Sequence, residues 1–327
     1  MAKSNPFGPK GWTPDRVGNL TGKTYLITGA NAGAGYEAAK IFLTKGASIV
    51  MLNRSEPKSR NAIAKLKSEL GLQVDVRFIP MDLADLASVR AAAERVNAEV
   101  PQIDAFIQNA AIAQVATLQF TKDGFESQLG TNHYGHFLLT GLIFDRLVEN
   151  KARIIVVGSG GHKMGHKRIQ FEDINFKENY NPHYTYCHSK YAQMAFAYEL
   201  ERRVKAANLP VSVHVCHPGA ARTTLSKEEA NGITKFLFTL LSPLAQSAER
   251  GAWPEVLCAT EDNLKPAAYC GPTRRAEMVG PVGECALEES VLDPEQAAKL
   301  WELSEAETGF AWSAQSGKNP GGANAAA

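Results

Sequence analysis

The chain has 327 residues, with 35 lysines and arginines against 34 aspartates and glutamates, so its formal net charge is +1. This balance excludes the basic excess by which nucleic-acid-binding proteins attract phosphate backbones. The content of 44% hydrophobic and 21% charged residues is that of a globular protein with a sizeable core. Five cysteines, never spaced as Cys-x-x-Cys, are typical of a reduced, cytoplasmic chain and not of a disulfide scaffold or a zinc ribbon.

No part of the sequence predicts stable membrane insertion. The amino-terminal residues lack the apolar segment of a secretory signal, and no run of about 18 apolar residues predicts a transmembrane helix. We therefore expect a cytoplasmic protein. Residues 1–20, rich in glycine, proline and polar residues, predict an irregular surface arm, and residues 313–327 predict a disordered tail.

From Lys23 onward, short and β-branched apolar runs alternate with longer amphipathic segments. The runs predict strands at 24–29, 47–53, 73–80, 103–110, 153–159, 211–217 and 268–270. The intervening segments predict helices, among them 186–207, 248–259 and a last one that opens at Asp293-Pro294. This alternation implies right-handed crossovers and a doubly wound α/β Rossmann fold. We expect one domain over residues 21–312, with a parallel sheet flanked by helices.

The first predicted strand runs into a glycine-rich turn, Thr28-Gly29-Ala30-Asn31-Ala32-Gly33-Ala34-Gly35, at the start of a helix. A turn this tight needs glycine where φ is positive and where the backbone must approach a pyrophosphate. The helix N-terminus then offers free N–H groups and the positive end of its dipole to the phosphates. The pattern predicts a nucleotide site, the alternative being an ordinary strand-to-helix turn.

The second predicted strand ends in Asn53-Arg54-Ser55. An NAD-binding protein usually places a carboxylate here to bind the ribose 2′-hydroxyl, and that carboxylate would repel a 2′-phosphate. A guanidinium can bind the phosphate bidentately, so Arg54 favours NADP over NAD, and Ser55 can add a hydroxyl donor. The alternative is a solvated arginine at the end of a strand.

The spacing of the turn, Thr-Gly-x-x-x-Gly-x-Gly, resembles that of the short-chain dehydrogenase/reductase family, and the resemblance continues along nearly the whole chain. It implies a bound nicotinamide dinucleotide. The residues that would contact it are Gly29, Asn31, Ala32, Gly33, Gly35, Arg54, Asp82, Leu83, Asn109 and Ala110. Gln108 and Ala111 depart from the family pattern of asparagine and glycine at these positions, which leaves the local turn geometry open.

The family's catalytic pattern, Tyr-x-x-x-Lys, occurs twice, at Tyr36 and Lys40 and at Tyr186 and Lys190. Only Tyr186 follows the fifth predicted strand, where the family has its acid/base residue; we expect it to open the helix there. On a helix, four residues of separation place both side chains on one face. The ammonium of Lys190 is therefore expected to lower the pKa of the Tyr186 phenol.

Three further motifs match the family pattern. The resemblance implies that Ser159 positions the substrate oxygen, and that Asn132 kinks its helix and holds a water in the proton relay. After the sixth predicted strand, His217-Pro218-Gly219 resembles the turn that holds the nicotinamide carboxamide, together with a downstream threonine hydroxyl. These motifs extend the expected cofactor contacts to Tyr186, Lys190, Pro218, Gly219 and Thr223.

Residues 223–246 occupy the place of the family's substrate lid, and the segment 233–244 is densely apolar. It either closes over a lipophilic alcohol, ketone or aldehyde, packs on the domain or on a partner subunit, or makes shallow membrane contact. Several stretches, including Tyr186-Cys187-His188-Ser189-Lys190, resemble the retinol dehydrogenase and protochlorophyllide reductase branch of the family.

Together the patterns predict an NADP-dependent oxidoreductase that interconverts a hydroxyl and a carbonyl group on a lipophilic substrate, with Tyr186 as acid/base. The alternatives are a catalytically quiet cofactor-sensing or regulatory protein of the same fold, and a C=C reductase similar to protochlorophyllide reductase. The resemblance also implies that helices at 132–148 and 186–207 can pair across a homodimer. His162 and His166 lack a third ligand, so no metal site is expected.

Overall fold

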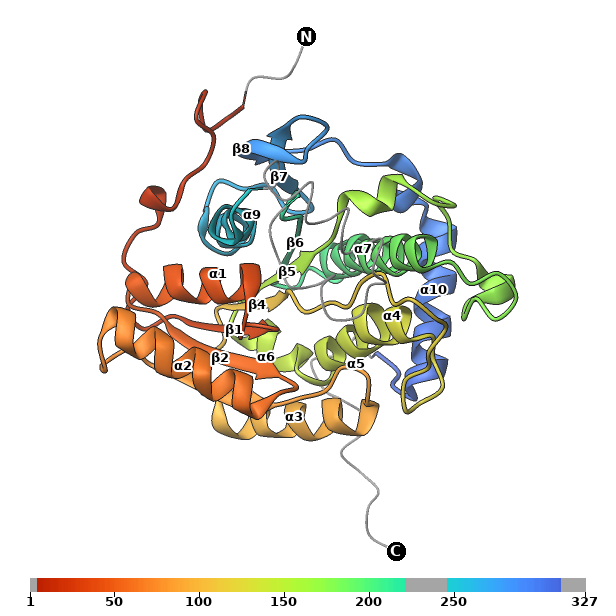
Figure 1. The fold of residues 1–327 in the computed structure, drawn as a ribbon, viewed down its shortest axis with the longest axis horizontal. Coiled ribbons are helices and arrows are strands. Elements are labelled where there is room, and N and C mark those ends of the chain that lie inside the picture. Colours follow the sequence, from red (N-terminus) through yellow and green to blue (C-terminus); the bar gives the residue numbers. More distant parts are fainter. Residues whose placement is uncertain (1–4, 221–245, 313–327) are drawn as a thin grey trace, which may run out of the picture.

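The computed structural model describes residues 5–220 and 246–312. Its centre is one eight-stranded sheet with the strand order β3-β2-β1-β4-β5-β6-β7-β8 (Figure 1). The strands are β1 (Thr24–Thr28), β2 (Ser48–Asn53), β3 (Val76–Pro80), β4 (Ala105–Gln108), β5 (Arg153–Val157), β6 (Ser212–Cys216), β7 (Tyr269–Arg274) and β8 (Val279–Glu284). Each neighbouring pair from β3 to β7 is parallel, whereas β8 runs antiparallel to β7. The predicted α/β Rossmann fold is confirmed.

Helices cover both faces of the sheet (Figure 1). They are α1 (Gly33–Thr44), α2 (Glu56–Leu70), α3 (Leu86–Glu99), α4 (Ser127–Leu129), α5 (Gly135–Leu142), α6 (Phe144–Glu149), α7 (Pro182–Ala206), α9 (Ala248–Thr260) and α10 (Pro294–Thr308). Successive strand residues point to opposite faces of the sheet and belong to two hydrophobic cores. Leu26 packs with α3, α5 and α7 on one face, while Tyr25 and Ile27 pack with α1 and α9 on the other. A sheet buried on both faces explains why the strands are almost continuously apolar.

The strand order reverses beside β1, because β2 follows it on one side and β4 lies on the other. The chain therefore leaves β1 and β4 toward opposite faces of the sheet. This divergence opens a crevice at the carboxyl ends of the strands, which is where open α/β sheets bind their ligands. The residues of the candidate site belong to the segments that follow these strand ends.

Helix α7 begins at Pro182, four residues before the expected start at Tyr186. Asn181 caps it, since its side-chain oxygen accepts hydrogen bonds from the backbone N–H groups of His183 and Tyr184, both at 3.0 Å. A capping residue followed by proline is a strong helix start. The prediction that Tyr186 opens the helix is wrong: Tyr186 lies one turn inside it, where its backbone is fixed by helical hydrogen bonds.

The strand predicted at 268–270 is half of a hairpin, β7–β8, that the sequence did not indicate. Its connection contains Arg275, Ala276 and Glu277, all with positive φ between 51° and 63°. Hairpin turns with positive φ normally use glycine, asparagine or aspartate. The connection contains none of these residues, and for this reason the sequence did not predict a hairpin turn here.

The amino-terminal segment is anchored to this hairpin, so the expected surface arm is wrong at one point. The backbone N–H of Trp12 donates to the carbonyl of Val282 at 2.9 Å, and its indole Nε1 donates to Glu261 at 3.0 Å. The Trp12 side chain is fully buried.

Among the helices of the described ranges, none combines the length and apolar character needed to cross a membrane. The expected boundaries of the domain stay a prediction, and the tail from 313 lies outside the described residues.

Candidate active site

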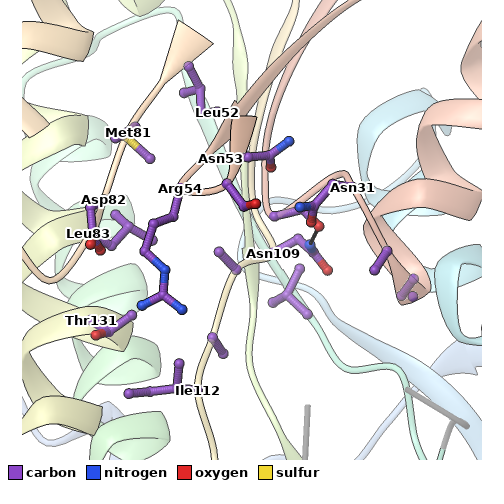
Figure 2. A pocket seen from close by; sticks show the side chains of 18 of the residues that line it. Asn31, Leu52, Asn53, Arg54, Met81, Asp82, Leu83, Asn109, Ile112 and Thr131 are labelled. Atoms are coloured by element: carbon purple, nitrogen blue, oxygen red, sulfur yellow. Dashed lines mark hydrogen bonds between the residues drawn. The ribbon is translucent and has the colours of Figure 1, made fainter. Parts of the chain in front are cut away.

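A cleft opens at the carboxyl ends of the central strands, and most of the predicted cofactor residues line it (Figure 2). These lining residues are Gly29, Asn31, Ala32, Gly33, Arg54, Asp82, Leu83, Asn109, Ala110, Tyr186, Lys190 and Pro218. Residues from five strand ends, far apart in the sequence, thus meet around one cavity. Gly35, Asn132, Ser159 and Gly219 are described but stand outside the lining, and Thr223 lies outside the described residues.

The glycine-rich turn forms the floor of the cleft. Gly29 has φ of +72°, and a Cβ there would lie 2.9 Å from the Cα of Ala110, too close for any side chain. Gly35 lies behind the turn, where a Cβ would collide with the Asn109 amide. Ala32 precedes α1 without a side-chain cap, so the N–H groups of the first helical turn remain for an anion. The turn therefore fits the pyrophosphate of a dinucleotide.

Two asparagines brace this turn from neighbouring strands. Asn109 Nδ2 donates to the carbonyl oxygens of Thr28 at 2.8 Å and Gly29 at 3.2 Å. Asn53 Oδ1 accepts a hydrogen bond from the N–H of Ala30 at 2.9 Å. Sequence reasoning missed this role of Asn53, because nothing local to β2 shows that its amide reaches the turn after β1. Both contacts fix the backbone before a ligand binds.

Arg54 follows β2 and extends along the cleft (Figure 2). In the part of the chain that the structure describes it forms no salt bridge, so its guanidinium is available to a ligand. Ser55 caps α2 by accepting the Lys58 N–H at 3.4 Å, which leaves its hydroxyl hydrogen for another acceptor. Lys58 also lines the cleft and was not predicted. This end of the cleft is cationic.

Ser159 and Tyr186 interact beside the cleft, since Ser159 acts on the ionisation of the Tyr186 phenol. Ser159 follows β5 and accepts the Gly161 N–H at 3.1 Å, which orients its hydroxyl. Burial raises the pKa of Tyr186, and Ser159 opposes this rise. The expected lowering of this pKa by Lys190 is wrong for the protein alone, because the desolvation of the phenol outweighs the charges around it.

Lys190 is itself almost completely buried. Its Nζ donates to the carbonyl of Val157 and to Oε1 of Gln193, both at 2.9 Å. Burial lowers the pKa of Lys190 to about 7, while the nearby Cys216 and Glu255 raise it in part. Burial thus works against the ammonium form of Lys190 in the protein alone.

Asn132 lies in a π-helical turn, Gly130–Tyr134, between α4 and α5. Its side chain bonds the backbone of Ile112 in both directions, at 2.9 and 3.0 Å, and donates to Ser189 at 2.9 Å. A π-turn is a local distortion of the kind often found at functional sites. The side chain thus ties the segment after β4 to α7, while the water relay expected at Asn132 stays a prediction.

His136 stands one turn after Asn132, and its tautomer follows from its partners. Its Nδ1 faces the carbonyl of Asn132 at 3.0 Å and must carry the proton. Its Nε2 therefore accepts from the hydroxyl of Thr28 at 3.0 Å. Burial lowers the pKa of His136 to about 3. A neutral histidine, unnoticed in the sequence, thus links the glycine-rich turn to the π-turn.

The turn after β6 is held by a network that joins it to the hairpin. His217 Nδ1 accepts the N–H of Gly219 at 3.3 Å, and its Nε2 lies 3.5 Å from Cys285 Sγ. Ligand atoms of His217, Glu277 and Cys285 lie within 4.8 Å of one another. However, the Gly219 N–H places the His217 proton on Nε2, and Glu277 already pairs with Lys163 at 2.6 Å. The trio is therefore arranged to brace the turn and not to hold a cation.

The fold and this cleft are those of a dinucleotide-binding α/β protein. Comparison with known proteins agrees: the model of the short chain dehydrogenase family matches residues 23–172. Human retinol dehydrogenase 14 is 36% identical over 310 residues, covering 90% of this chain and 88% of its own length. Human retinol dehydrogenase 12 is 34% identical, with the same shares covered.

A solved structure is similar over an equally long stretch. The crystal structure of an uncharacterized protein from Mycobacterium paratuberculosis has a TM-score of 0.75 and 33% sequence identity to this chain. The match covers 92% of this chain and 99% of the other. The chain therefore belongs to the short-chain dehydrogenase/reductase family, on its retinol dehydrogenase-like branch. This confirms the predicted family and the prediction of an oxidoreductase enzyme.

Proposed function

We propose that the protein interconverts a hydroxyl and a carbonyl group on a lipophilic small molecule, with NADP as its cofactor and Tyr186 as its acid/base. The observation that carries the proposal is that Ser159 acts on the phenol of Tyr186 beside a cleft that fits a dinucleotide and that Tyr186 and Lys190 line. A phenol and a second hydroxyl at one point can bind a substrate oxygen together. A bound nicotinamide supplies or accepts the hydride.

In this reaction each residue of the site has its own role. Tyr186 holds the proton that moves to or from the substrate oxygen, and Ser159 donates a hydrogen bond that orients that oxygen. Lys190, fixed by Val157 and Gln193, places a positive charge one helical turn from the phenol and favours the phenolate. No carboxylate stands in Asn53-Arg54-Ser55 after β2, and the guanidinium of Arg54 can pair with a 2′-phosphate, which supports NADP over NAD.

Support for a lipophilic substrate comes from the segment after Ser159. Met164 is 49% exposed and Tyr184 is 48% exposed. Gly165 connects them in space, since a Cβ at Gly165 would touch both the Tyr184 ring and Cys187 next to the catalytic tyrosine. Exposed large apolar side chains, a few positions in sequence from Ser159 and Tyr186, are suited to contact with an apolar ligand. The predicted lid, 223–246, lies almost entirely outside the described residues.

The test is a cofactor assay on the purified protein with aldehydes and ketones of increasing apolar size. We expect NADPH to be consumed and NADH to be consumed more slowly, with the reverse reaction seen for the matching alcohols and NADP. A protein that binds NADPH but consumes none with any carbonyl compound would instead be a cofactor-sensing or regulatory member of the family.

A further inference from the structure

Glu255 is a buried acid with no hydrogen-bonding partner. It lies in the middle of α9, its side chain is fully buried, and neither carboxyl oxygen has a partner among the described residues. A buried carboxyl group without hydrogen bonds is costly, and proteins rarely keep one without a charged neighbour. Its position next to a proline and a tryptophan gives no packing reason for an acid.

The charged neighbour of Glu255 is Lys190. Helix α9 packs across β5 and β6 (Figure 1), and these strands end side by side, with Val157 paired to Cys216. Lys190 Nζ is bound to the carbonyl of Val157 at this same point. Glu255 interacts electrostatically with Lys190 and also with Cys216. The acid therefore approaches the catalytic lysine from the opposite face of the sheet.

Other charges that are packed against α9 lie at its two ends. Near its start, Glu37 and Lys40 of α1 interact with Glu249. Near its end, Arg16 pairs with Glu261 and Arg153 pairs with Asp262, at 3.1 and 3.0 Å. Around the middle of the helix the titratable groups are the buried thiols of Cys216, Cys258 and Cys270. Burial raises the pKa of Cys216 and Cys258, and the neighbouring Cys258 together with burial raises that of Cys270, so the thiols stay neutral. Among the described residues, Lys190 is thus the charged group that acts on Glu255.

Each of the two groups favours the charged form of the other. Burial raises the pKa of Glu255 to about 8 and lowers the pKa of Lys190 to about 7, and each charge opposes the effect of burial on its partner. The carboxylate form favours the ammonium, and removal of Glu255 leaves the buried lysine to lose its proton more easily.

We propose that Glu255 is a positioning residue that acts through Lys190, as the buried counter-charge that keeps this lysine an ammonium while Tyr186 exchanges its proton. This rests on the proposed roles of Tyr186 and Lys190. A neutral residue at this position leaves the ammonium uncompensated.

The test is an NMR titration of the full-length protein labelled with ¹³Cε-lysine, alone and saturated with NADP. The Lys190 signal is assigned by its loss in Lys190→Met. In Glu255→Gln we expect Lys190 to titrate at a pH lower by about one unit or more, the usual scale of a buried charge pair. Glu249→Gln, which removes an exposed acid from the same helix, should leave the titration unchanged, and Glu255→Asp should restore most of it.

An activity profile adds the second readout. If Lys190 must be an ammonium, the alkaline limb of kcat/KM moves to lower pH in Glu255→Gln, and Glu255→Asp recovers it. An unchanged Lys190 titration in Glu255→Gln overturns the inference, whether or not the enzyme turns over. A shifted titration in a protein without any turnover contradicts the proposed function and leaves the coupling of the two groups standing. Should Glu255→Gln fail to fold, Glu255→Leu takes its place, because an apolar side chain fills the buried position without a charge. An unchanged Lys190 titration in Glu255→Leu then overturns the inference.

Discussion

Ser159 acts on the phenol of Tyr186, although 27 positions of sequence separate them and they belong to different elements. Ser159 is itself oriented, because its Oγ accepts the Gly161 N–H at 3.1 Å and caps a short 3₁₀-helix, Gly160–Lys163. Its hydroxyl hydrogen remains for an acceptor. Ser159 opposes the effect of burial, which raises the pKa of Tyr186, so it favours the phenolate needed for alcohol oxidation.

Ser159→Ala should therefore raise the pKa of the phenol further. Oxidation, which needs the phenolate, should then require a higher pH, and the acid limb of the kcat/KM profile should move upward. Carbonyl reduction, which needs the phenol, should lose less at neutral pH. Profiles of both directions check this, with Ser68→Ala, at an exposed position of α2, as a control outside the site. An acid limb at its original pH in Ser159→Ala would contradict the assigned role.

Arg54→Asp should reverse the preference between the two cofactors. The guanidinium should contribute roughly the 1.5–3 kcal/mol of a charge-assisted hydrogen bond to NADPH binding, whereas an aspartate repels the phosphate and binds the ribose hydroxyl of NADH. Titration of the purified protein with each cofactor, followed by fluorescence, measures both dissociation constants. Arg60→Ala, on the exposed face of α2 and outside the cleft, is the matched control. Equal affinity of the original protein for NADPH and NADH would rule out the NADP assignment.

Met164→Ser should flatten the dependence of kcat/KM on substrate size. Each methylene buried against the protein should add about 0.8 kcal/mol, so efficiency should rise along a series of aldehydes until the site is full. Loss of the exposed Met164 surface should weaken the longer members more than the shortest. Leu72→Ser, which removes an 82% exposed side chain elsewhere, should leave the series unchanged. An identical slope in Met164→Ser would remove this segment from the substrate site.

The protein should lose stability as the pH falls from about 6.5, because burial lowers the pKa of His133, His136 and His188 to about 3 each. The unfolded chain then binds more protons than the folded one, so the loss runs from the unfolded pKa of about 6.5 down to about 3. His133→Phe removes one of these groups, and its new ring lies next to Phe137 and Phe196. The slope of the free energy of unfolding against pH should then fall by about 1.4 kcal/mol per pH unit. Urea unfolding at several pH values measures it.

His133→Phe also loses a 2.7 Å hydrogen bond to Ser304, so its stability at neutral pH should be lower than that of the original protein. The slope, and not the absolute value, carries the prediction. His166→Phe, at an exposed loop position, controls for the loss of a histidine as such. A slope that is the same in all three proteins would show that His133 does not stay neutral when folded.

The sequence could indicate those site residues whose requirement is local. Gly29 stands where φ is positive, and Tyr186 and Lys190 stand four apart on one helix, so the backbone alone relates them to the site. Asn53 and Glu255 could not be found in this way. Asn53 accepts a hydrogen bond from Ala30, which follows the neighbouring strand, and Glu255 interacts electrostatically with Lys190 from the other face of the sheet. Their roles depend on the register of β1 with β2 and of β5 with β6, which a single sequence does not specify.

The misplaced elements have a similar origin. The hairpin β7–β8 turns on residues with positive φ that are not glycine, and they are held there by Lys163 pairing with Glu277 across 114 positions of sequence. The arm around Trp12 is ordered because Val282 of that hairpin offers it a backbone partner. Because the hairpin was not predicted, the anchoring of the amino-terminal segment to it could not be predicted either.

The most direct test of the account is a comparison of Tyr186→Phe with the original protein in one NADPH assay, against the same panel of aldehydes. The variant keeps the ring but has no transferable proton, so turnover should fall by about 10²–10⁴, the usual contribution of general acid–base catalysis. Its NADPH dissociation constant should change little. Turnover of Tyr186→Phe close to that of the original protein, with the same substrates, would contradict the assignment of Tyr186 as the acid/base.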